Sequence, residues 1–153
     1  MKKRLVLALS MGALMLALVS GVALAATLIG SNGPDTIYGT KHADLIRGRA
    51  GADLLFGRAG ADSIYGGLGN DRLQGNTSHD SLHGKSGNDR LSGGYGRDAI
   101  YGGPGNDYIV SNDIRLGYPD GQRDVVHCGR GHDTVYADSS DKVASDCEVV
   151  ATQ

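Results

Sequence analysis

Aliphatic residues recur along this chain at intervals of nine. Between residues 37 and 109 every ninth position is Ile or Leu, flanked by mixed residues: Ile37, Ile46, Leu55, Ile64, Leu73, Leu82, Leu91, Ile100 and Ile109. Because successive side chains of a strand point to opposite faces, each triplet predicts a three-residue strand with one inward side chain. The remaining six residues of each unit are predicted to form a turn. The pattern predicts an all-β fold of short strands around a thin aliphatic core.

Asp and Gly share this period. Two positions before each aliphatic residue stands an Asp, and five positions before each Asp stands a Gly, the nine glycines running from Gly30 to Gly102. A second Gly usually lies two positions before the Asp. Three superposed periods of nine indicate a repeat architecture, which takes precedence over local propensity.

Composition agrees with a repeat of tight turns. The chain of 153 residues contains 25 Gly, one Phe and no Trp. Gly weakens helix and strand interiors, which argues against a helical bundle or an ordinary α/β enzyme, but it adopts positive φ and allows backbone carbonyls to converge. The Gly excess therefore belongs to the repeat.

The units resemble the haemolysin-type, or RTX, calcium-binding nonapeptide repeat, Gly-Gly-x-Gly-x-Asp-x-aliphatic-x. The closest copies begin at Gly66, Gly93 and Gly102, and weaker copies continue to about Val135. The resemblance implies a right-handed parallel β-roll, a β-solenoid in which nine residues make half a turn. It also implies that Asp side chains and loop carbonyls hold Ca²⁺ between successive turns.

In such a roll, Asp residues 18 positions apart stack in two columns. Edge one contains Asp35, Asp53, Asp71, Asp89 and Asp107, and edge two contains Asp44, Asp62, Asp80 and Asp98. Carboxylates about 4.8 Å apart repel one another, so a column requires cations, and Ca²⁺ accepts both carboxylate and carbonyl oxygens. We expect up to about seven ions, one per gap of the regular stretch. The expected metal ligands are these nine Asp residues with Gly48, Gly66, Gly69, Gly84, Gly87, Gly102, Gly105 and Asp133.

The two edges differ in sequence. On edge two the second Gly of the unit is lost twice, to His42 and Ser78. We also assign to edge two a degraded second motif position, where a fixed cation should weaken a calcium loop: Thr40, Arg49, Arg58, Asn76 and Lys85. We therefore expect edge one to bind calcium more tightly.

The first 25 residues have the order of a secretory signal peptide. A basic start, Lys2 to Arg4, precedes an apolar stretch and the small residues Ala23-Leu24-Ala25. The alternative, a membrane anchor, is disfavoured because the apolar run is short and interrupted by Ser and Gly. Without this segment the chain has 12 basic and 17 acidic residues. We expect a secreted, mildly acidic protein without a membrane span, suited to cations rather than nucleic acid.

The regular roll is expected over residues 26–110, followed by a loop insertion at 111–123 and by degenerate repeats with a C-terminal cap at 124–153. The insertion is either a passive bulge, which we favour, or a ligand contact. Cys128 and Cys147 are 19 residues apart, close to one turn of 18, and export permits a disulfide. We expect a disulfide-stapled cap, with two free thiols as the alternative.

Other chemistry is sparse, and no catalytic role is expected. The sequence lacks His-Glu-x-x-His and Gly-x-Ser-x-Gly motifs, and Glu148 is its only Glu. Tyr38, Phe56, Tyr65 and Tyr101 are interpreted as scattered surface aromatics rather than as a sugar-binding patch. The sequence therefore predicts a secreted calcium-binding protein whose roll folds on binding Ca²⁺. The alternative is an extracellular surface or matrix module, adhesin-like or glycan-binding, with purely structural calcium and an unidentified protein or glycan partner.

Overall fold

The computed structural model describes residues 25–111 and 122–152, and their regular structure is entirely β. These two ranges hold no helix that could cross a membrane. The predicted signal peptide and most of the predicted insertion at 111–123 lie outside the described residues.

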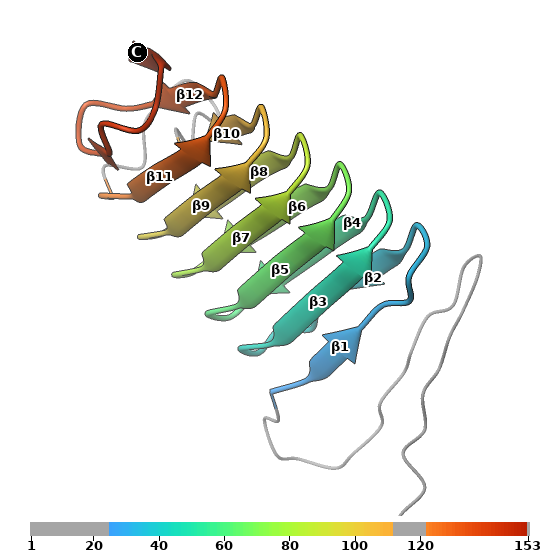
Figure 1. The fold of residues 1–153 in the computed structure, drawn as a ribbon. Helices are drawn as coiled ribbons and strands as arrows, with labels where there is room; N and C mark the ends of the chain where they lie inside the picture. Colours follow the sequence, from blue (N-terminus) through green and yellow to red (C-terminus); the bar gives the residue numbers. More distant parts are fainter. Residues whose placement is uncertain (1–24, 112–121, 153) are drawn as a thin grey trace, which may run out of the picture.

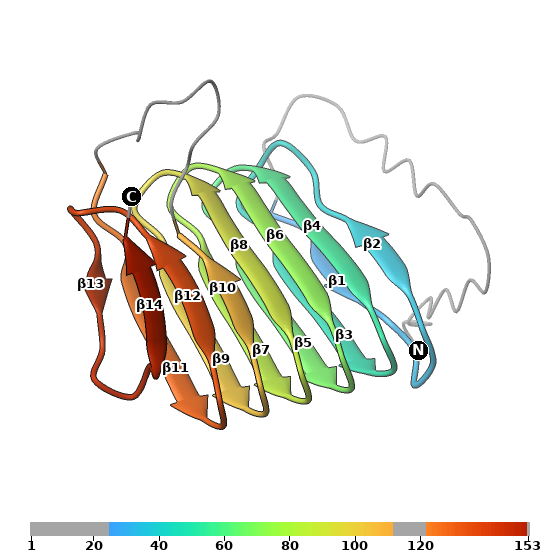
Figure 2. The ribbon, with the colours of Figure 1, turned by 90° about the horizontal axis from the view of Figure 1, so that it is seen from above.

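Fourteen strands in the described ranges form two parallel sheets that face each other (Figures 1 and 2). The first sheet has the order β1 (Thr27–Ile29), β3 (Leu45–Ala50), β5 (Ser63–Leu68), β7 (Ser81–Ser86), β9 (Ala99–Pro104), β11 (Val125–Arg130) and β13 (Lys142–Val143). The second has the order β14 (Val149–Thr152), β12 (Thr134–Ala137), β10 (Tyr108–Val110), β8 (Arg90–Tyr95), β6 (Arg72–Thr77), β4 (Leu54–Ala59) and β2 (Thr36–Tyr38). Successive strands alternate between the sheets, which confirms the predicted parallel β-roll.

The register between neighbouring strands is one full turn. Ile46 lies opposite Ile64, and Leu73 lies opposite Leu91, each pair 18 residues apart. In the two strand pairs that span the insertion, β9 with β11 and β10 with β12, the offset is 26 residues, so that Ile100 lies opposite Val126. The extra eight residues therefore leave the columns of side chains unbroken.

The core is a double row of aliphatic side chains. From Ile46 to Ile109, every predicted inward Ile or Leu is at most 2% exposed, and Val126 and Val135 continue the rows. Ile37, at the start of the roll, is only partly buried. Each unit contributes one such side chain, so the core is too narrow for an aromatic ring.

The predicted division into a six-residue turn and a three-residue strand is wrong for most units. Most strands have six residues, and the turn between them has three, such as 69–71 between β5 and β6. The strand continues through the first two motif positions because the first Gly faces the interior, as Gly66 does in β5. The second position then takes a positive φ, which bends the strand without ending its pairing.

The surface aromatics form columns, so the interpretation as scattered residues is wrong. On the first sheet Tyr65, His83, Tyr101 and His127 stack with ring centroids 4.6–5.4 Å apart and planes within 4° of parallel. On the second sheet Tyr38 stacks on Phe56. The ring faces are therefore turned toward one another along the roll.

Truncating the core should cost far more than truncating the surface. Leu82→Ala removes a fully buried side chain and should lower the free energy of unfolding by about 3 kcal/mol. Gln74→Ala, on an exposed position of β6, should change it by less than about 0.5 kcal/mol. Chemical unfolding in saturating calcium measures both, and equal losses would contradict the double-row core.

Candidate metal centre

The Asp residues of edge one form a hydrogen-bonded column. The Oδ1 atom of each Asp accepts the backbone N–H of the Asp one turn earlier, at 2.7–2.9 Å, from Asp53 through Asp133. Glu148 extends the column, because its Oε2 atom accepts the N–H of Asp133 at 2.8 Å. The predicted stacking is therefore present, and the backbone N–H groups explain why the carboxyl groups share one orientation.

Edge two repeats the arrangement. Oδ1 atoms of Asp44, Asp62, Asp80 and Asp98 accept N–H groups from the preceding turn, beginning with that of Ala26. Asp124 and Asp141 continue the column at 2.8 and 3.0 Å. Both columns thus run through the C-terminal part of the roll, past the regular repeats.

The Asp side chains face the interior of the roll, not the solvent. Asp44, Asp53, Asp62, Asp71, Asp80, Asp89, Asp98, Asp107 and Asp133 are each at most 4% exposed. On seven of these carboxyl groups the second oxygen, Oδ2, is buried and has no hydrogen-bond partner among the described residues: Asp53, Asp62, Asp71, Asp80, Asp89, Asp107 and Asp133. A buried carboxylate oxygen without a partner is costly, and it indicates a missing ligand.

In the regular repeats each of these Oδ2 atoms shares the space beside the first Gly of its unit with a backbone carbonyl oxygen of the next turn. A Cβ on Gly66 would lie 2.7 Å from the carbonyl oxygen of Gly84, one turn later, and closer still to Oδ2 of Asp71. We call this space, beside the first Gly of the unit, a cradle. The described residues form five cradles with both oxygens on edge one and three on edge two, in the units that begin with Gly30, Gly48, Gly66, Gly84 and Gly102, and with Gly39, Gly57 and Gly75.

The predicted glycines fall into two groups, of which the cradle involves one. The carbonyl oxygens of Gly48, Gly66, Gly84 and Gly102 each face the cradle of the preceding turn. Gly69, Gly87 and Gly105 instead lie in the three-residue turns, where a Cβ would collide with the carbonyl of the turn before. Their positive φ belongs to this close stacking of turns, and their role as calcium ligands stays a prediction.

The second motif position decides whether Oδ2 has a partner. Ser31 and Thr40 stand there in the first two units, and their N–H groups donate to Oδ2 of Asp35 and Asp44. In the following units this position has a positive φ, as at Arg49 and Gly67, and Oδ2 of Asp53 and Asp71 has no hydrogen-bond partner among the described residues. Sequence reasoning missed this distinction, although Ser and Thr at this position mark it.

The assignment of Arg49 and Lys85 to edge two is wrong. Both residues precede turns of edge one, the turns that end in Asp53 and Asp89. Lys85 Nζ lies 5.7 Å from the ring centroid of Tyr65, so its charge is directed to the outer face of the sheet. Thr40, Arg58 and Asn76 remain on edge two, but a cation now stands at this position on both edges. The predicted difference in affinity between the edges therefore depends chiefly on His42 and Ser78, and it stays a prediction.

Burial raises the pKa of Asp carboxyl groups in both columns. Desolvation raises the pKa of Asp80 to about 8 and that of Asp89 to about 7, against an opposing effect of the backbone hydrogen bond and a further rise from neighbouring Asp residues. Burial likewise raises the pKa of Asp53, Asp62 and Asp107 to about 6. Without a cation, each of these carboxyl groups must either stay charged in a buried place, which is costly, or take up a proton near neutral pH.

The atoms that face each cradle, and that could bind a metal ion there, are carboxylate and carbonyl oxygens. No group of three His, Cys, Asp or Glu side chains converges within the described residues, so a bound ion would take one or two carboxylates and backbone carbonyls. Calcium prefers such ligands, with six to eight oxygens and flexible geometry. The cradles therefore fit calcium and do not fit a metal that requires nitrogen or sulfur ligands.

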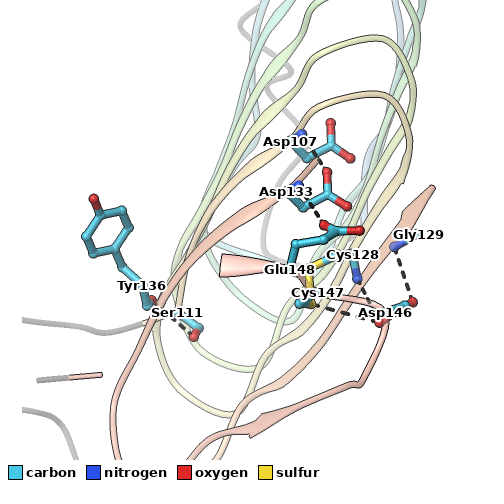
Figure 3. The surroundings of a disulfide bond; sticks show 9 residues. All are labelled: Asp107, Ser111, Cys128, Gly129, Asp133, Tyr136, Asp146, Cys147 and Glu148. Carbon is cyan, nitrogen blue, oxygen red and sulfur yellow. Dashed lines mark hydrogen bonds between the residues drawn. A yellow bond between two sulfur atoms is a disulfide. The ribbon is translucent and has the colours of Figure 1, made fainter. Parts of the chain in front are cut away.

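The C-terminal end of edge one carries a disulfide, as predicted (Figure 3). Cys128 of β11 is bonded to Cys147, with their Cα atoms 5.1 Å apart. Next to it, Asp146 accepts the N–H groups of Cys128 and Gly129 at 3.4 and 3.2 Å. The predicted alternative of two free thiols is excluded.

Sequence reasoning also missed a ladder of side-chain amides on edge one. The Oδ1 atoms of Asn70 and Asn88 accept the N–H groups of Asn88 and Asn106, each at 2.8 Å. His132 donates its N–H to Asn106 Oδ1 in the same way. The spacing of 18 between the three Asn residues was the signal that could have revealed it.

Relief of backbone strain should stabilise the roll at the second motif position. Arg49 has a φ of 88°, a conformation that costs a residue with a Cβ about 1 kcal/mol. Arg49→Gly should therefore raise the free energy of unfolding by up to about 1 kcal/mol, whereas Arg49→Ala should not. Urea unfolding in saturating calcium measures the difference, and equal effects of the two substitutions would contradict it.

The raised Asp pKa values predict that acid stabilises the calcium-free roll. The folded state binds more protons than the unfolded state between about pH 4 and pH 8, since unfolded Asp titrates near 3.8 and Asp80 near 8. Stability without calcium should therefore fall as pH rises through this window. Circular dichroism in chelator, from pH 8 down to pH 5, should show a growing β signal, and a signal that grows toward pH 8 would contradict the prediction.

The chain was compared with known families and proteins. The family model described as RTX calcium-binding nonapeptide repeat (4 copies) matches residues 20–55, 38–73 and 74–109. No curated protein matches the sequence. The matched segments run from residue 20 to residue 109, more than half of the chain, and they contain the regularly spaced Asp residues from Asp35 to Asp107 and the first Gly of every cradle. The chain belongs to the family of RTX calcium-binding nonapeptide repeat proteins.

Proposed function

We propose that this is a secreted calcium-binding protein whose β-roll folds when Ca²⁺ ions bind between its turns. The observation that carries the proposal is the buried, unpartnered Oδ2 of residues such as Asp71, which faces the same cradle as a carbonyl oxygen of the next turn. A bound Ca²⁺ ion would compensate the charge of the buried carboxylate and accept both oxygens as ligands.

The proposal explains why the fold should depend on the ion. The hydrophobic core contributes only one aliphatic side chain per nine residues, while each unit also buries a carboxyl group. Burying an uncompensated charge opposes folding, so the free energy of calcium binding becomes part of the free energy of folding. The family's repeats are typical of extracellular proteins, where calcium is abundant, and the signal-like residues 1–25 support the same location.

The units differ in how well they suit an ion. Asp53, Asp71, Asp89 and Asp107 on edge one, with Asp62 and Asp80 on edge two, combine an unpartnered Oδ2 with a complete cradle. Asp35 and Asp44 have complete cradles, but N–H groups already occupy their Oδ2 atoms. We infer that the middle turns of the roll bind calcium most tightly.

Calcium should induce β structure in the secreted protein. Circular dichroism should show a largely disordered chain in chelator and a β signal that appears at about 10⁻⁴–10⁻³ M calcium, the range of extracellular modules. Magnesium at equal concentration should not replace it, because Mg²⁺ retains its water and demands octahedral geometry. A β signal that is unchanged by chelator at neutral pH would overturn the folding switch.

An isosteric variant separates ion binding from ordinary packing. Asp71→Asn keeps the shape of a protonated Asp, so it should leave the calcium-free chain no less stable while raising the calcium midpoint several-fold. The neighbouring Arg72→Gln, on an exposed position of β6, is the matched control and should not raise the midpoint. If both variants shift the midpoint alike, Asp71 is not a ligand.

A further inference from the structure

The first motif position changes in the last part of the roll. It is Gly in the nine units that begin at Gly30 through Gly102, and then it becomes Ser111, Cys128 and Ala137. All three residues are buried, with exposures of 2%, 0% and 0%. Their side chains therefore enter the interior at the places where the earlier units have no Cβ.

The register shows what the Cys128 side chain meets. His127 and Gly129 lie opposite Tyr101 and Gly103, so Cys128 stands beside Gly102 and has the same inward orientation. At Gly102 a Cβ would come within 2.5 Å of the next carbonyl and closer to the Oδ2 of its own Asp. At Cys128 that Cβ exists, and it bears a sulfur atom. The equivalent cradle, which would belong to Asp133, is thus filled by the side chain.

The disulfide spans the gap that an ion would otherwise span. In the regular units the cradle lies between one turn and the next, and at Cys128 the next turn is formed by residues 146–148. Cys147 lies in that segment, and Figure 3 shows the disulfide beside the carboxyl groups of Asp133 and Glu148. The covalent bond therefore connects the same two turns.

Edge two closes its last gap in a comparable way. The hydroxyl of Ser111 donates to Oδ2 of Asp141 at 2.8 Å, and Asp141 is the next member of the column after Asp124. A side chain at the first motif position again contacts the following turn directly. The C-terminal end of each column is therefore connected by the chain's own atoms.

We propose that Cys128 excludes calcium from the last gap of edge one and that the Cys128–Cys147 disulfide replaces the ion as the link between turns. The inference rests on the proposed function, calcium binding between turns. It makes the cradle of Asp107, to which Cys128 contributes its carbonyl oxygen, the last calcium site of edge one. It assigns no ion to Asp133, unlike the expectation from sequence. Oδ2 of Asp133 has no hydrogen-bond partner among the described residues, but the buried Cys128 side chain occupies the space in which an ion would reach it.

The chemistry of this gap favours a covalent link. Asp146 and Glu148, the acidic residues that face it from the cap, are exposed, so an ion held there would compete with solvent on one side. A disulfide in an oxidising environment needs no calcium. The terminal turn is then held in place whatever the calcium concentration, as long as the disulfide is intact.

The number of bound ions tests the proposal. Cys128→Gly combined with Cys147→Ser restores a complete motif, Gly-Gly-Arg-Gly-His-Asp, and opens the cradle. Cys128→Ser with Cys147→Ser is the matched control, which lacks the disulfide but keeps a side chain in the cradle. Native mass spectrometry in saturating calcium should find one more ion in the Gly variant than in wild type, and the same number in the Ser variant as in wild type.

A second measurement avoids reliance on the folding of the Gly variant. Asp133→Asn in the otherwise wild-type, oxidised protein should leave the number of calcium ions unchanged, whereas Asp107→Asn should remove one. Loss of an ion on Asp133→Asn, or equal ion numbers in wild type and in a folded Gly variant, would overturn the inference. Absence of calcium from wild type itself would instead overturn the proposed function.

Discussion

The structure depends on one constraint, the stacking of buried carboxyl groups along the inside of two edges. Each Asp uses Oδ1 to accept a backbone N–H from the preceding turn, and this bond aligns the turns. The same geometry directs Oδ2 into the interior, where most of the middle units offer it no donor. A hydrogen-bonded column that orders the roll thus also leaves the buried carboxylate oxygens on which the proposed calcium sites depend.

The glycines serve this constraint in two different ways. The first Gly of a unit, such as Gly66, has no Cβ and leaves room for an Asp oxygen and a carbonyl oxygen to approach the same space. The second position, as at Gly67, has a positive φ, and in units such as those of Asp53 and Asp71 Oδ2 then has no N–H donor. The high Gly content is therefore a requirement of the interior, although in most proteins it would indicate flexible loops.

The two ends of the roll use contacts of the chain itself where the middle leaves carboxylate oxygens unpartnered. At the N-terminal end, backbone N–H groups of Ser31 and Thr40 bind the Oδ2 atoms of Asp35 and Asp44. At the C-terminal end, the Ser111 hydroxyl and the Cys128–Cys147 disulfide connect the last turns. The middle turns, where we propose that calcium binds, are thus bounded by segments that use ordinary hydrogen bonds and one covalent bond.

Sequence and tertiary structure decided different features of this protein. The period of nine by itself determined the roll, the inward aliphatic residues from Ile46 to Ile109 and the membership of each Asp column, because a strict repeat forces equivalent residues into equivalent places. It did not determine the strand length, the aromatic stacks or the partners of Oδ2. Those depend on φ at the second motif position and on contacts between residues 18 or 26 apart, such as Tyr101 with His127, which exist only once the turns are stacked.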